Sequence, residues 1–107
     1  MTTVTFKNEN GRICGFCCSG HSGYAESGAD VVCAAVSAAV KFAEATLNDV
    51  LGAHAKVKVN EANAEITLTL PAACEDETAV QAVLTGMMLT MCSLRDEYPD
   101  NIEVLEV

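Results

Sequence analysis

The chain has 107 residues, half of them apolar and a fifth charged, which predicts one globular domain with a single hydrophobic core. Its net charge of -9 repels phosphate backbones, so it argues against direct binding of nucleic acid and favours basic partners. The N-terminal residues lack the charged start and apolar middle of a signal peptide, and no apolar run predicts a membrane span. The six cysteines are therefore expected to be reduced thiols in a cytoplasmic protein.

The first predicted elements are two strands of a hairpin. Val4 and Phe6 alternate with polar neighbours, and the segment Arg12–Ser19 continues the extended pattern after a turn at residues 8–11. From Gly20 to Gly28 three glycines and the lack of apolar periodicity predict a loop. A helix follows, with Asp30 as its N-cap and Gly52 as its C-terminal cap.

The second half of the chain predicts another hairpin, a helix and a last strand. Residues 56–59 and 65–70 alternate strictly, which is typical of strands with one buried and one solvated face. Acidic residues 75–77 suit the start of a helix that runs to Pro99, and a strand spans residues 101–107. The order ββαββαβ predicts an α+β fold, a mixed and mostly antiparallel sheet with two helices on one face. The solvated face and the sheet edges leave room for a homodimer.

Cys33 is the cysteine best placed to act as a nucleophile. If Asp30 caps the helix, Cys33 lies in its first turn, where free amide groups and the helix dipole stabilise a thiolate. His21 lies on the glycine-rich loop twelve residues earlier, so the chain has enough length to bring its imidazole to the sulfur. The alternative, a small buried thiol and an unrelated loop histidine, stays open on these residues alone.

The cysteines before the loop suggest a metal or redox site, but their spacing favours packing. In a regular strand Cys14 and Cys18 share one face and Cys17 points to the other, so a shared ion would require a bulge. No His or Cys cluster supplies further ligands. We therefore predict no metal and no cofactor.

The segment SGHSGYAESGADVVCAAVSA, residues 19–38, resembles the signature of the ribosomal processing cysteine protease (Prp) family. In that family a Gly-His-Ala-Gly-Tyr-Ala loop precedes Asp-Ile-Val-Cys-Ala-Ala-Val-Ser, and the element order and length fit the whole chain. The catalytic His and Cys of the family match His21 and Cys33, and two further motif positions match Asp30 and Ser37. The resemblance implies a homodimeric α+β cysteine endopeptidase that removes a short N-terminal extension from a large-subunit ribosomal protein. The chain departs from the family pattern at Ser22, where Ala is usual, and in the Cys17-Cys18 doublet.

The resemblance implies roles for the residues around the dyad. The amides of the first helical turn would hold the oxyanion while His21 takes and returns the proton. Asp30 either caps the helix or orients the imidazolium, and Ser37 either contacts the same site or packs the helix. Loop residues are expected either to form turns or to order over a bound peptide, namely Gly20, Ser22, Gly23, Tyr24 and Gly28.

Two other functions compete with proteolysis. A noncatalytic ribosome-assembly module would use the acidic surface to hold a basic ribosomal protein, and its Cys33 would be unreactive. A redox sensor built on Cys17 and Cys18 would respond to oxidation without cleaving peptides. Labelling of Cys33 and a cleavage assay separate the three.

Overall fold

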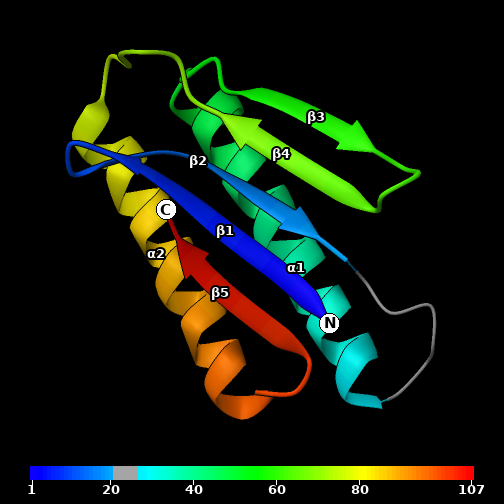
Figure 1. The fold of residues 1–107 in the computed structure, drawn as a ribbon. Helices are drawn as coiled ribbons and strands as arrows, with labels where there is room; N and C mark the ends of the chain where they lie inside the picture. The colour runs from blue at the N-terminus through cyan, green and yellow to red at the C-terminus, as the bar shows by residue number, and fades with distance from the viewer. Residues whose placement is uncertain (21–26) are drawn as a thin grey trace.

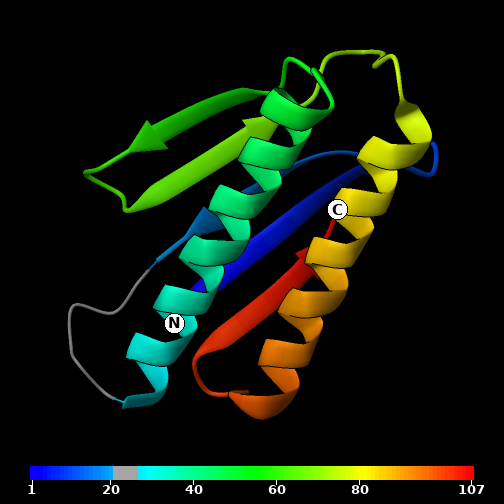
Figure 2. The same ribbon diagram turned by 180° about the vertical axis from the view of Figure 1, so that it is seen from behind.

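The structure is a computed structural model that describes the backbone of residues 1–20 and 27–107 and the side chains of residues 1–20 and 31–107. Five strands form one sheet with the order β3-β4-β2-β1-β5, and both helices cover the same face of it (Figures 1 and 2). Strand β5 pairs with β1 in parallel and the other neighbours pair antiparallel, which confirms the mixed α+β fold. In chain order the elements are β1 (Thr2–Glu9), β2 (Arg12–Ser19), α1 (Ser27–Glu44), η1 (Ala45–Val50), β3 (Lys56–Asn60), β4 (Glu65–Thr69), α2 (Glu77–Glu97) and β5 (Ile102–Glu106).

The β1–β2 hairpin contains a bulge that the alternating pattern did not predict. Its turn is Asn10-Gly11, both with positive φ (52° and 79°), as a two-residue hairpin turn requires. Lys7 pairs with Gly15 but Asn8 pairs with Ile13, so Cys14 is an extra residue on β2. The prediction that Cys14 and Cys18 share a face assumed a regular strand, and β2 is not regular at Cys14. Cys18 is buried in the core and Cys14 is half-buried.

Helix α1 begins three residues earlier than predicted. It starts at Ser27, so Asp30 is the fourth residue of the helix and is not its N-cap. Gly28 likewise belongs to α1 and not to the preceding loop. An acidic residue in the first turn is favourable toward the helix dipole even without a capping role, which explains why the sequence pattern suggested a start at Asp30.

The end of the first helix is wider than an α-helix. Residues 45–50 form the π-helical turn η1, in which the amide of Leu51 donates to the carbonyl of Thr46 at 3.0 Å. Gly52 follows with φ +60°, which confirms it as the C-terminal cap. The Asn48 side chain then bonds both backbone groups of Ala55, at 2.8 and 3.1 Å, and so fixes the turn into β3.

Helix α1 packs one apolar stripe against the sheet. Val32, Val36 and Val40 are buried there, at a spacing of four residues, against a core that includes Phe6 and Phe16. By length and composition Val31–Val50 could cross a membrane, contrary to the expectation that no segment approaches a span. The burial of its valine stripe in the core is typical of a packed helix in a globular domain.

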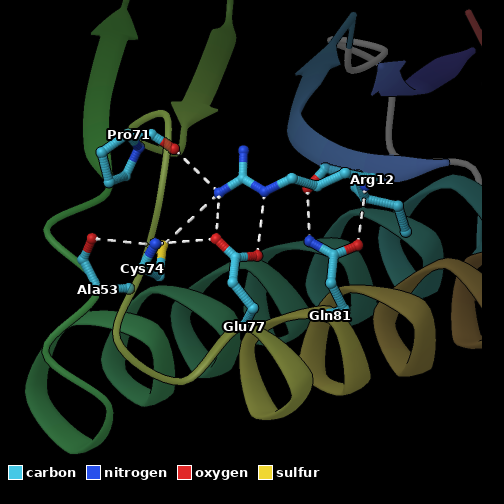
Figure 3. Close-up of polar contacts among 7 residues, drawn as sticks. Arg12, Ala53, Pro71, Cys74, Glu77 and Gln81 are labelled. Carbon is cyan, nitrogen blue, oxygen red and sulfur yellow. Dashed lines mark hydrogen bonds and ion pairs between the residues drawn. The ribbon is translucent and has the colours of Figure 1, made fainter. Parts of the chain in front are cut away.

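Helix α2 is joined to the start of β2 by a polar cluster (Figure 3). Arg12 donates to both carboxylate oxygens of Glu77, at 2.9 and 3.0 Å, and to the carbonyl of Pro71 at 2.9 Å. The amide of Cys74 donates to the same carboxylate at 2.8 Å, and Gln81 exchanges two hydrogen bonds with the backbone of Ile13. These contacts fix the position of the start of α2 relative to β2.

The Glu77 carboxylate should give this cluster a measurable pH dependence. Its pKa is lowered, first by the hydrogen bond from Arg12 and then by the amide of Cys74. The stabilisation is therefore present above the ordinary pKa of a glutamate and is lost as the pH falls through the lower, folded-state pKa. We expect Glu77→Gln to reduce the change in the urea-unfolding midpoint between pH 6 and pH 3. Glu75→Gln, at an exposed neighbour, should leave this pH dependence unchanged. Parallel pH curves for wild type and Glu77→Gln would contradict this.

Candidate active site

A cleft of about 340 Å³ lies between α1 and the end of the sheet where β2 ends and β4 begins. Its lining combines apolar side chains with hydroxyl groups and two charged residues, as expected for a ligand-binding site. The residues that line it are Thr2, Cys18, Ser19, Gly20, Cys33, Val36, Ser37, Val40, Lys41, Glu44, Ala64 and Ile66.

Helix α1 supplies the polar wall of this cleft. Cys33, Ser37 and Lys41 are four residues apart and therefore lie on one helix face, next to the buried valine stripe. Cys33 is half-buried and Ser37 is exposed, so both can meet a ligand that enters from solvent. Ser37 thus lines the same cleft as Cys33, and its contact with a substrate stays a prediction.

The earlier helix start changes the electrostatic environment expected for Cys33. Six residues separate Ser27 from Cys33, so the thiol side chain originates roughly 9 Å along the axis from the first helical residue. The dipole effect falls off within the first turn, and amides beyond it are bonded within the helix. First-turn amides are therefore no longer the obvious oxyanion donors, and activation of the thiol depends more on a nearby base.

A second thiol of the cleft, Cys18, is unsuited to nucleophilic attack. Its pKa is raised to about 12, mainly by burial and to a smaller extent by the neighbouring Cys17. At neutral pH Cys18 is thus a protonated core residue, since only the thiolate is an effective nucleophile. Of the two cleft thiols, Cys33 alone combines access to solvent with a place on the polar helix face.

Gly20 follows the last residue of β2 and lines the cleft. It has φ +70°, and a Cβ added there would lie 2.9 Å from the carbonyl oxygen of Met1, so glycine is required on two counts. His21 is the next residue of the chain. His21, Ser22, Gly23 and Tyr24 lie outside the described residues, as does the side chain of Asp30, so their predicted roles stay predictions.

The remaining cysteines pack individually. Cys17 accepts a hydrogen bond from the Thr67 hydroxyl at 3.6 Å, and Cys14 donates to the carbonyl of Lys7 at 3.4 Å. All six cysteines are unpaired. Within the part of the chain that the structure describes, no group of three or more His, Cys, Asp or Glu residues is placed to hold a metal ion. The absence of a metal stays a prediction.

Several cleft residues were not predicted from the sequence. Lys41 and Glu44 follow Cys33 at helical spacing and could have been found by projecting the helix. The opposite wall, with Thr2 from β1 and Ile66 from β4, depends on the strand order, which the sequence pattern did not determine.

Comparison with known proteins identifies the family of this domain. The family model described as "Cysteine protease Prp" matches residues 1–103. The chain belongs to the cysteine protease Prp family. The ribosomal processing cysteine protease Prp of Bacillus subtilis (strain 168) is 27% identical over 106 residues, which cover 97% of this chain and 94% of that protein.

Solved structures share the fold over the whole chain. Prp from S. aureus in complex with a substrate peptide superposes with a TM-score of 0.88 at 19% identity, over 100% of both chains. The same S. aureus protein with a covalently linked product peptide gives 0.84 at 22% identity, also over 100% of both. SMU.848 from Streptococcus mutans gives 0.88 at 22% identity, over 100% of this chain and 94% of that one. These similarities confirm the ββαββαβ architecture.

Proposed function

We propose that this chain is a cysteine endopeptidase that removes the N-terminal extension of a large-subunit ribosomal protein, with Cys33 as nucleophile and His21 as base. Membership of the Prp family supports peptide hydrolysis. The relative in Bacillus subtilis is a ribosomal processing protease, and an S. aureus family member has been captured with a covalently linked product peptide. The observation that carries the assignment is the accessible Cys33 in a cleft whose other thiol is a buried, protonated core group.

The proposed reaction is a two-step acyl transfer. His21 takes the proton of Cys33, and the sulfur forms a bond to the scissile carbonyl carbon while the peptide C–N bond breaks. His21 returns the proton to the leaving amine, and water then hydrolyses the thioester to release the second product. Ser37, one turn after Cys33 in the same cleft, supplies a hydroxyl that can hydrogen-bond the substrate. Asp30, which matches a characteristic position of the family motif, is proposed to orient the imidazolium.

The direct test is cleavage of the host's own ribosomal protein. We expect the purified chain to shorten the extended ribosomal protein at one bond, detected by mass spectrometry and N-terminal sequencing. A basic N-terminal peptide is the expected partner because the protein carries a charge of -9. The same charge supports the absence of direct nucleic-acid binding, and the six free thiols support a cytoplasmic location without membrane attachment.

We also propose that the chain forms a homodimer through the outer surface of its two helices, the side that faces the viewer in Figure 2. Phe42 is 69% exposed and lines one side of a hollow of about 630 Å³, most of whose other lining residues are small. In a two-fold symmetric dimer the same surface of both copies forms the interface. Each Phe42 would therefore insert into the hollow of the other copy. The hollow is lined by Ala35, Ala38, Ala39, Phe42, Ala82, Val83, Gly86, Met87 and Thr90.

Substitution of Phe42 tests this interface. We expect light scattering after size exclusion to give a dimer mass for the wild type and a monomer mass for Phe42→Asp. Val59→Asp, at an exposed apolar residue of β3 and not on either helix, is the matched control and should stay dimeric. A monomeric wild type, or a dimer that survives Phe42→Asp, would contradict the proposed interface.

A further inference from the structure

The geometry points to Lys41 as a specificity-determining residue that sets where the substrate is cut, an inference that rests on the proposed function. Among the described residues that line the cleft, Lys41 is the one cation and Glu44 the one anion. Lys41 is exposed, and neither ion pair found among the described side chains involves it. Its ammonium group is therefore available to a peptide in the cleft.

The distance from Cys33 fixes which substrate residue Lys41 meets. Eight helical residues separate the two, which is roughly 12 Å along α1. An extended peptide advances about 3.3 Å per residue, so the third or fourth residue from the scissile bond lies level with Lys41. Between them the peptide passes the apolar side chains of Val36 and Val40, which offer no charge to a substrate residue.

The sign of this charge is opposite to that of the protein as a whole. With a net charge of -9 the surface attracts cationic peptides in many registers, and attraction alone does not select one bond. A cation at one position of the cleft repels Lys or Arg from that position and so excludes registers in which a basic residue lies there. Lys41 therefore restricts cleavage to a neutral or acidic residue at the third or fourth position, with the basic residues placed outside the cleft.

Charge-swapped peptides and a charge-swapped enzyme test this role. A peptide that the wild type cleaves is made with Lys, Gln or Glu at the third and fourth positions on each side of the bond, and kcat/KM is measured for each. We expect the wild type to prefer Glu over Lys by about three- to tenfold at one position, because an exposed attractive charge pair replaces a repulsive one. Lys41→Gln should bring that ratio close to one and Lys41→Glu should invert it, and added salt should reduce both preferences.

Lys56→Glu is the matched control, because it makes the same change in net charge on an exposed residue of β3 that does not line the cleft. It should leave the positional preference unchanged. If the ratio of kcat/KM values for the Lys and Glu peptides is the same in wild type and Lys41→Glu at every position, the role of Lys41 is overturned. Cleavage of the peptides would still support the protease function. An equal inversion by Lys56→Glu would also overturn it, since the effect would then be one of overall charge. Failure of the wild type to cleave any peptide would contradict the proposed function.

Discussion

Replacement of Cys33 by alanine is expected to abolish peptide cleavage, lowering kcat/KM by on the order of 10⁴-fold or more, as for other enzymes that lose a covalent nucleophile. No other cleft thiol can take its place, because burial raises the pKa of Cys18 to about 12. His21→Ala should cause a loss of similar size, since the thiol then lacks its proton acceptor. The measurement is kcat/KM on one peptide for both variants, with circular dichroism to verify folding.

Substitutions of other cysteines provide the matched controls for that result. Cys92→Ala and Cys14→Ser change half-buried thiols that do not line the cleft, so they should retain activity within a few fold. A folded Cys33→Ala protein that still turns over, or a comparable loss in Cys92→Ala, would contradict the assignment of the nucleophile.

Alanine at Gly15 is expected to cost at least about 2 kcal/mol of unfolding free energy. Gly15 lies in the middle strand of the sheet and pairs with Lys7 on one side and Thr69 on the other. A Cβ there would overlap the carbonyl oxygen of Leu68 and lie 3.3 Å from the Cα of Thr69. Because these are backbone atoms of β4, they cannot move aside as a flexible side chain would, and β4 must separate from β2.

Gly86→Ala is the control for Gly15→Ala. Nothing lies within 4 Å of a methyl group added at Gly86, and alanine is the better helix former by up to about 1 kcal/mol. Urea unfolding, measured in the Phe42→Asp background so that the proposed dimer does not contribute, should therefore show a higher midpoint for Gly86→Ala and a much lower one for Gly15→Ala. Equal midpoints for the two variants would contradict the close approach of β4 to Gly15. Since Ile66 on β4 lines the cleft, Gly15→Ala should also weaken peptide binding.

Local signals account for the parts of the fold that were predicted. A few neighbouring residues set each of the turn at residues 8–11, the Gly52 cap and the helix start predicted at residues 75–77. In the structure Asp76 is the N-cap of that helix and accepts from the amide of Ala79 at 3.1 Å. The start of α1 was misplaced because Asp30 fits a first-turn position as well as a cap. The bulge at Cys14 depends on how β1 and β2 pair, which alternation within one strand does not reveal.

The candidate site likewise contains residues that the local sequence predicted and residues whose position depends on the strand order. The motif from Gly20 to Ser37 indicated Cys33 and Ser37, and the cleft contains both. The cleft itself exists because the starts of β1 and β4 and the end of β2 lie beside α1, and this arrangement follows from the strand order. Lys41 lies outside that motif, and only its spacing from Cys33 places it on the same helix face.

Active-site labelling tests the central claim most directly. A peptidyl chloromethyl ketone built on the ribosomal cleavage sequence is incubated with the folded protein, and the modified cysteine is located by peptide mapping while residual cleavage is followed in the same samples. The account predicts one label per chain, on Cys33, with activity lost in proportion to labelling. Labelling at another cysteine, or full activity in a protein whose Cys33 is completely modified, would contradict it.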